Sequence, residues 1–401
     1  MNIFSKTFCR IYQGAFRIAM PLLPYRKPLI FTNVKECVPL FQKLNLNKIL
    51  LVTDSFLRTS GITKALEDFM SQNNIKCVVY DKTNPNPTVK NVNEAKQLYI
   101  ENNCQGIIAF GGGSSMDCAK ATGACIAYPK KTLEQMKGLL KVWKKLPPLV
   151  AIPTTAGTGS EVTVTAVITN PEIKHKYTMN NFTMIPPYAV LDPEVTYSLP
   201  PSLTATTGMD ALTHAVEAYI GNSTTKETRS LALDATKLVF ENIQVAYNDG
   251  KNQKARANML KAAYKAGLAF SKSYVGYIHA VAHSLGGQYN IPHGLANSVL
   301  MPYVLESYGK CIHKKLKELS IAAGIGMESD NNEEAANNFI RAIRQMNKEM
   351  GIPEKLQGIK KKDIKTMAKH AAKEANPLYP VPKLMNAKQF EQFYYDVMEE
   401  K

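Results

Sequence analysis

Long apolar runs and ordered cysteine spacing are both missing from this sequence. No stretch reaches the roughly 18 consecutive apolar residues of a membrane-spanning segment, so we expect no spanning helix. The seven cysteines form no C-x-x-C pair and are irregularly spaced. Such spacing argues against a zinc ribbon and against a secreted disulfide framework. It is typical of free thiols in a reducing compartment, and we therefore expect a cytoplasmic protein.

Internal repeats and low-complexity segments are also absent from the 401 residues. The chain is 45% hydrophobic and 20% charged, which excludes a mostly disordered or fibrous protein. This length predicts two domains, and it buries enough apolar surface for folding without a structural metal. A metal site in this chain is therefore expected to be functional.

Acidic residues are in the minority, because 33 Asp and Glu residues stand against 49 Lys and Arg residues and leave a net charge of +16. The basic residues are spread along the whole chain with only short clusters, which are typical of solvated helix faces. We therefore expect no nucleic-acid partner. A basic surface does favour anionic ligands, a dinucleotide among them.

The first 35 residues contain no acidic residue at all. Apolar residues recur there at helical spacing, namely Phe4, Phe8, Ile11, Tyr12, Ala15, Phe16 and Ala19. The pattern predicts that residues 1–27 are an N-terminal extension with an amphipathic basic helix. Three interpretations are open: a helix packed on the body or on a partner chain, which we favour; a contact with an anionic membrane surface; and a mitochondrial presequence.

Strand-like and helical patterns alternate from residue 28 to 197. The predicted strands are Leu29–Thr32, Lys48–Thr53, Lys76–Tyr80, Gly106–Phe110, Leu149–Pro153 and Ala189–Leu191. This order predicts an α/β domain with a parallel sheet covered by helices on both faces. Residues 166–169 and 177–179 predict an added hairpin. Residues 198–401 carry long stretches of helical periodicity without convincing strands, and they predict a second, helical domain.

A glycine-rich loop, Gly111–Asp117, directly follows one predicted strand and opens a predicted helix. Glycines let the backbone approach a ligand closely, and backbone N–H groups at a helix N-terminus bind phosphate. Gly112, Gly113, Ser114 and Asp117 are the candidate cofactor-binding residues here. The loop lacks the G-x-G-x-x-G fingerprint, so a plain strand-to-helix turn is the alternative.

Other polar loops follow further strands of the predicted sheet. Asp54 ends one strand, where a carboxylate can accept hydrogen bonds from a ribose diol and favour NAD over NADP; a turn or helix cap is the alternative. Thr154–Ser160 is a second small-residue loop, rich in hydroxyls. Asn86 lies in a third loop, where a rigid proline turn is equally compatible. Together these loops predict a crevice for a dinucleotide.

Four of the seven histidines cluster in the second half of the chain with an aspartate, and these residues are Asp210, His214, His279, His283 and His293. Two pairs are spaced four residues apart and so share a helix face. A carboxylate with several imidazoles is a ligand set for Fe²⁺ or Zn²⁺. The H-x₃-H spacing alone suggests a zinc protease, but Ala280 stands where that motif needs its glutamate base.

These motifs resemble those of the iron-containing (group III) alcohol dehydrogenase family, over roughly residues 28–395. The motifs are Val52-Thr53-Asp54, Pro85-Asn86-Pro87-Thr88, Gly111–Ser114 with Asp117 and Lys120, Pro153–Thr158, Gly208–Ala215 and His279–His293. The resemblance implies a dehydroquinate synthase-like fold, with an N-terminal dinucleotide domain and a C-terminal helical metal domain. It also implies a homodimer or a larger assembly. The N-terminal extension and the high positive charge depart from typical members.

The resemblance also implies roles for single residues. Asp210, His214, His279 and His293 hold a divalent metal, usually Fe²⁺ and sometimes Zn²⁺. His283 faces the site near the nicotinamide, where it shuttles a proton, positions substrate or only packs. The positions that match NAD contacts are Asp54, Asn86, Gly113, Ser114, Thr154, Thr155, Thr158 and Lys176.

The expected activity is hydride transfer between a small primary alcohol or diol, or the matching aldehyde, and NAD(H). A metal-dependent hydrolase or lyase is disfavoured by the missing acidic base and by the two phosphate-type loops. A degenerate scaffold or membrane-surface binding protein on the same fold is the other alternative, and the intact ligand set argues against it. Both iron and zinc suit an aspartate with three histidines.

Overall fold

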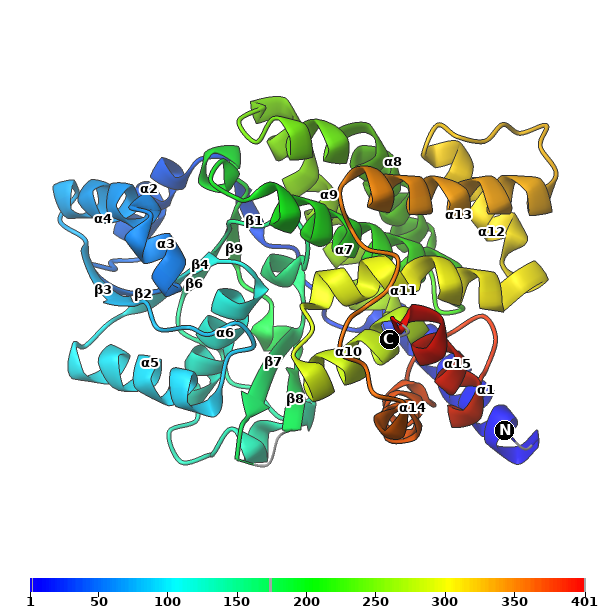
Figure 1. The fold of residues 1–401 in the computed structure, drawn as a ribbon. Coiled ribbons are helices and arrows are strands. Elements are labelled where there is room, and N and C mark those ends of the chain that lie inside the picture. The colour runs from blue at the N-terminus through cyan, green and yellow to red at the C-terminus, as the bar shows by residue number, and fades with distance from the viewer. Residues whose placement is uncertain (2, 173–174, 400–401) are drawn as a thin grey trace. The chain divides into compact units, whose positions relative to one another are not determined.

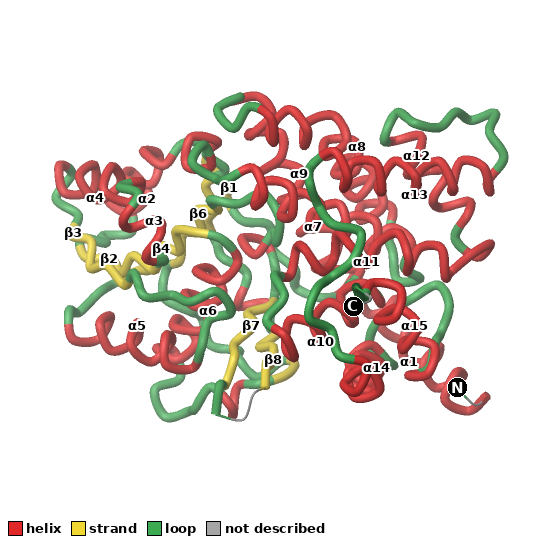
Figure 2. The backbone as a smooth tube through the Cα atoms, in the orientation of Figure 1, coloured by secondary structure: helices red, strands yellow, loops and turns green. Residues whose placement is uncertain are grey.

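The computed structural model describes residues 1, 3–172 and 175–399, which divide into two compact units (Figure 1). One unit is Pro24–Ser198, and the other combines Met1–Leu23 with Leu199–Lys401. The first contains the strands and the second is built from helices, as the tube in Figure 2 shows. The predicted fold class, a parallel-sheet domain followed by a helical domain, is confirmed.

A six-stranded parallel sheet forms the centre of the α/β unit, with the strand order β1-β9-β6-β4-β2-β3. Its strands are β1 (Leu29–Phe31), β2 (Lys48–Val52), β3 (Lys76–Tyr80), β4 (Gly106–Gly111), β6 (Leu149–Pro153) and β9 (Tyr188–Val190). The inner strands β2, β4 and β6 are almost wholly buried, which explains why they are apolar without alternation.

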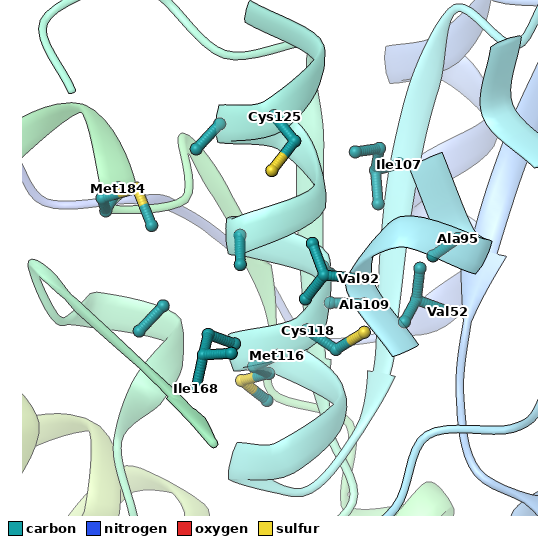
Figure 3. Close-up of a cluster of buried hydrophobic side chains, with 14 of the residues drawn as sticks. Val52, Val92, Ala95, Ile107, Ala109, Met116, Cys118, Cys125, Ile168 and Met184 are labelled. Atoms are coloured by element: carbon teal, nitrogen blue, oxygen red, sulfur yellow. The ribbon is translucent and has the colours of Figure 1, made fainter. Parts of the chain in front are cut away.

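Helices cover both faces of this sheet (Figure 1). On one face, Ile49 and Leu51 of β2 pack with α2 (Cys37–Lys43) and α4 (Ile62–Gln72), and α3 (Ser55–Thr59) adds Leu57. On the other face, Leu50 and Val52 pack with α5 (Val89–Glu101) and α6 (Gly113–Ala127). Figure 3 shows this second cluster, with Val52 close to Val92 and Ala95. Successive side chains along β2 therefore pack against the helices on opposite faces of the sheet.

A smaller sheet with the order β5-β8-β7 accompanies the main one. Its strands are β5 (Gly138–Leu139), β7 (Thr165–Asn170) and β8 (His175–Asn180). Strands β7 and β8 pair antiparallel, so the predicted hairpin is confirmed. Strand β5 was not predicted, because two residues are too short to show a period.

The helical unit surrounds one buried helix, α7 (Pro201–Ile220). Every residue of α7 from Gly208 to Ile220 is buried. The surrounding helices are α1 (Ile3–Ala19), α8 (Lys226–Asn248), α9 (Gln253–Ser273), α10 (Tyr277–Tyr289), α11 (His293–Tyr308), α12 (His313–Ala322), α13 (Asn332–Glu349), α14 (Lys361–Ala375) and α15 (Ala387–Val397). None of the helices over the described residues is long and apolar enough to cross a membrane.

Helices α8 and α9 approach α7 closely at Gly208. A Cβ atom there would lie 2.7 Å from Ile243 Cδ1 and 2.8 Å from Met259 Cε. An added side chain at this point would therefore force the ends of Ile243 and Met259 to move. This close packing holds α7 in place, and α7 carries the first two residues of the predicted metal site.

Candidate functional site

The four predicted metal ligands come together in the helical unit. Asp210 and His214 lie on α7, His279 on α10, and His293 is the first residue of α11. One ligand atom from each of the four lies within 4.8 Å of all the others. Asp210, His214 and His279 are buried and His293 is partly exposed, so the group opens on one side only.

The geometry of this group suits a divalent cation. Asp210 Oδ1 lies 3.5 Å from His293 Nε2 and 4.0 Å from His279 Nε2. Burial, followed by the neighbouring histidines, holds the pKa of His279 well below its usual value, so this imidazole is neutral and offers a lone pair. One carboxylate with three imidazoles fits Fe²⁺ or Zn²⁺. The residues present therefore match the metal that the sequence predicts.

Glu217 orients His279 and was not predicted from the sequence. Its Oε2 lies 2.6 Å from His279 Nδ1 and accepts a hydrogen bond from the backbone N–H of Gly276, while Oε1 accepts one from Ile278. Burial raises the pKa of Glu217 to about 7, although hydrogen bonds from the backbone N–H groups of Gly276, Ile278 and His279 oppose the rise. Engaging Nδ1 in this way turns Nε2 toward Asp210, as in other carboxylate–histidine–metal arrangements. The spacing from His214, three residues on the same helix, is the signal that could have revealed it.

Asn297 is a second contact that sequence reasoning missed. It lies one turn after His293 on α11 and donates from Nδ2 to Asp210 Oδ1 at 2.7 Å. The same nitrogen lies 3.1 Å from His293 Nε2 and 3.2 Å from His279 Nε2. Asn297 is fully buried, so it holds the ligand side chains from within the core.

Phe270 packs against the metal ligands from α9. Its ring stacks on the ring of His214 with centroids 4.1 Å apart. This contact restricts the rotation of His214, which lies on the buried helix.

His283 lies beside the metal group but is not one of its four members. Its ring stacks on His293 with centroids 5.2 Å apart, and its Nδ1 lies 2.6 Å from Glu374 Oε1. Tyr379 donates a hydrogen bond to the same oxygen at 2.7 Å. Burial alone would raise the pKa of Glu374, but His283 and Tyr379 hold it below its ordinary value. Glu374 is therefore an ionised acceptor that orients His283, and it too was not predicted.

The predicted cofactor loops lie in the α/β unit. They follow β6, β4, β2 and β3, which are neighbours in the sheet and parallel, so all the loops leave the same edge. The glycine loop contacts the hydroxyl loop: a Cβ atom on Gly113 would lie 2.8 Å from Thr158, and one on Gly112 3.4 Å from Thr155. Thr154 is buried and donates its backbone N–H to the end of β4. A larger side chain at Gly113 would therefore force the Thr158 side chain to move, whereas a Cβ atom at Gly112 would make an ordinary contact with Thr155.

Three predicted cofactor residues from separate segments form a hydrogen-bonded group. Lys176 Nζ donates to Asn86 Oδ1 at 2.8 Å, and the Asn86 backbone N–H donates to Ser114 Oγ at 3.3 Å. Asn86 has a positive φ of 61°. The group places an ammonium beside the first turn of α6, which favours an anionic ligand such as a diphosphate.

Two predicted cofactor-binding residues form hydrogen bonds with other residues of the chain. Asp54 Oδ1 accepts a hydrogen bond from the backbone N–H of Leu57 and so caps α3. The helix-cap alternative therefore applies to one of the two carboxylate oxygens of Asp54. Asp117 accepts from Ser160 Oγ on Oδ1 and from Val167 N on Oδ2, and burial raises its pKa. Asp117 thus ties α6 to the hydroxyl loop and to β7. A cofactor contact by either residue stays a prediction.

A pocket of about 320 Å³ lies beside Asp54, at the ends of β2 and β3. It is lined by Ser55, Arg58, Thr59, Asp81, Lys82, Thr83 and Asn84. Its position matches the place expected for the sugar end of a dinucleotide.

Comparison with known proteins assigns the family. Residues 29–193 match the iron-containing alcohol dehydrogenase family, and residues 204–398 match the C-terminal domain of the Fe-containing alcohol dehydrogenase family. Alcohol dehydrogenase 4 of Saccharomyces cerevisiae is 37% identical over 356 residues, which cover 88% of this chain and 92% of the relative.

Solved structures agree with this assignment. The crystal structure of a 1,3-propanediol oxidoreductase matches with a TM-score of 0.90 and 34% identity, covering 94% of this chain and all of the other. Sulfoacetaldehyde reductase from Bifidobacterium kashiwanohense, solved in complex with NAD⁺, matches with a TM-score of 0.82 and 28% identity over 94% and 99% of the two chains. Sequence, ligand cluster and fold agree, and the chain belongs to the iron-containing alcohol dehydrogenase family.

Proposed function

We propose that this protein is a metal-dependent alcohol dehydrogenase that transfers hydride between a small primary alcohol or diol, or the matching aldehyde, and NAD(H). The observation that carries the proposal is the group of Asp210 with His214, His279 and His293 in the helical unit. The activities named for similar proteins support the substrate class, since these proteins are an alcohol dehydrogenase and a 1,3-propanediol oxidoreductase.

A divalent cation held by these four residues would supply a positive charge that polarises an alcohol or carbonyl oxygen. Other residues of the chain orient the side chains that would bind the cation. Glu217 orients His279, burial keeps that imidazole neutral, and Asn297 restrains Asp210. We propose Fe²⁺ as the metal, with Zn²⁺ as the alternative, because the ligand set suits both ions.

His283 is the proposed proton-handling residue. Its Nδ1 is engaged by Glu374, so proton exchange with a substrate would use Nε2. An imidazole titrates near neutrality and suits this task. Positioning of the substrate is a related role, and packing beside the metal ligands without contact to the substrate is the competing one.

NAD(H) is proposed as the hydride carrier. Support comes from the glycine and hydroxyl loops at one sheet edge, the Lys176–Asn86–Ser114 group, and a similar protein solved with NAD⁺. A preference for NAD over NADP rests on the carboxylate of Asp54. We also propose a homodimer or a larger homo-oligomer. The seven unpaired cysteines support a reducing compartment such as the cytoplasm.

The first experiment is to measure the metal content of anaerobically purified protein together with NADH oxidation by C2 to C4 aldehydes. Near one metal per chain with turnover lost on chelation supports the proposal. His283→Ala should retain the metal and lose turnover, whereas Asp210→Ala should lose both. Turnover in metal-free protein would overturn the role of the ligand group, and metal without turnover on any short aldehyde would favour a scaffold role.

A further inference from the structure

Helix α1 is anchored to the helical unit along one side. Cys9 and Gln13 are buried, and Gln13 Nε2 donates to the backbone oxygen of Tyr379 at 2.7 Å. The Arg10 guanidinium donates to the backbone oxygens of Val381 and Pro382 at 2.7 and 2.8 Å. These contacts make α1 part of the folded unit, as the interpretation of a helix packed on the body expects.

The opposite side of α1 is apolar and exposed. We call this the α1 face; its members, with their exposed fractions, are Ile3 (75%), Phe4 (82%), Phe8 (60%), Ile11 (67%) and Ile18 (78%). Phe4, Phe8, Ile11 and Ile18 are separated by four, three and seven residues, which places them in one stripe of the helix. Of the 17 large apolar side chains exposed in the described part of the chain, seven lie within residues 3–22. Apolar side chains gathered in this way mark an interaction surface.

The segment that carries the α1 face is positively charged. Lys6 and Arg17 are exposed on α1, in one stripe with the anchored Arg10 and Gln13, and the first 35 residues carry no acidic side chain. Lys383 is exposed next to Pro382, which accepts a hydrogen bond from Arg10. The N-terminal end of α1 extends to the edge of the helical unit, where a large surface can reach it (Figure 1).

The positive charge helps to decide whether a second copy of the chain or an anionic membrane covers the α1 face. A second copy of the chain, docked symmetrically through this face, would bring together two positively charged N-terminal segments, neither of which has an acidic residue in its first 35 positions. An anionic bilayer would bury the same apolar side chains and attract the same cations. We propose that α1 holds this dehydrogenase on membrane surfaces rich in anionic phospholipid, with the helix lying in the interface plane.

The test is sedimentation of the full-length, metal-loaded protein with vesicles of phosphatidylcholine alone or with 30% phosphatidylserine. We expect binding to the anionic vesicles and at least a tenfold weaker partition to the neutral ones or in high salt. Phe4→Ser with Phe8→Ser should abolish binding, and Lys6→Glu with Arg17→Glu should abolish the preference for anionic lipid. All these side chains are exposed, so folding and aldehyde reduction in solution should stay at wild-type levels.

Two matched controls carry the same chemical changes elsewhere. Trp143→Ser with Met327→Ser removes two exposed apolar side chains, and Lys365→Glu with Lys369→Glu reverses two exposed charges on α14. Both should bind like the wild type. The proposal is overturned if wild-type protein stays in the supernatant, or if the controls lose as much binding as the α1 variants. It is also overturned if the Phe4 and Phe8 substitutions reduce the oligomeric state in light scattering, because the face would then join copies of the chain.

Discussion

Glu217 shows how a single residue outside the ligand set can control the metal. Replacing it with glutamine keeps the size but puts an amide where a carboxylate now faces three hydrogen donors. For Glu217→Gln we expect a loss of metal affinity of about 10- to 100-fold. A competition titration with a chromophoric chelator measures this, with the exposed Glu333→Gln as the control. Unchanged affinity would show that His279 is oriented without Glu217.

Asp54 allows a test of cofactor choice that spares the helix cap. Asparagine caps helices as well as aspartate does, so Asp54→Asn should keep α3 while removing the negative charge. We expect the ratio of kcat/KM for NADH to that for NADPH to fall by about tenfold or more. The exposed Asp68→Asn is the matched control. If the ratio does not move, Asp54 serves only as a cap.

We expect the carboxyl group of Glu161 to make the stability of the α/β unit depend on pH. It is buried, and burial raises its pKa from 4.5 to about 7. Between these two values the folded chain holds a proton that the unfolded chain has lost, so the stability contributed by this group falls as pH rises from 4.5 to 7. In urea unfolding, the free energy of unfolding of the wild type relative to Glu161→Gln should fall by up to about 3 kcal/mol in total across this range. Parallel curves would show that Glu161 is ionised throughout.

Elements of the α/β unit follow the sequence closely. The β-branched apolar runs predicted β2, β3, β4 and β6 within one residue at each end. For the inner strands β2, β4 and β6 the reason is that a strand buried on both faces must be apolar throughout. Helix α6 begins at Gly113, inside the glycine-rich loop that was expected to open a helix. The missed strand, β5, has only two residues, and its pairing with β8 is a tertiary contact with no local pattern.

Helix α7 depends on close packing at Gly208. In Gly208→Ala the added methyl meets the ends of Ile243 and Met259 and forces both to move. We expect a loss of about 1–3 kcal/mol in the free energy of unfolding, because overpacking strains a dense core. Gly287→Ala on α10 is the control, since its Cβ would meet nothing within 4 Å and alanine favours helix. Equal stabilities in chemical denaturation would contradict this close contact.

At the scale of the whole molecule, metal binding should stabilise the helical unit, because its ligands come from three separate helices. A metal at a hundred times its Kd contributes about 2.7 kcal/mol. We expect chelation to lower the unfolding temperature of this unit by several degrees, at about 2–4 °C per kcal/mol. Scanning calorimetry with and without chelator measures the shift. Asp210→Ala should unfold at one temperature under both conditions, and a chelator effect that survives in this variant would place the metal elsewhere.

Local spacing in the sequence established the alternation of strands and helices and the candidate ligands Asp210, His214, His279, His283 and His293. The resemblance of the motifs indicated the family and singled out four of these residues, and the tertiary structure brings one ligand atom from each of the four within 4.8 Å of the others. Asp210 and His214 are four residues apart, and no fold with that helix could separate them. Glu217, Asn297 and Glu374 became evident only in the tertiary structure. Each acts through a partner whose distance and orientation depend on how separate helices pack; His283 and Glu374, for instance, are 91 positions apart. The same holds for α1, whose spacing predicted an amphipathic helix, while only packing decided which face is buried and which is exposed.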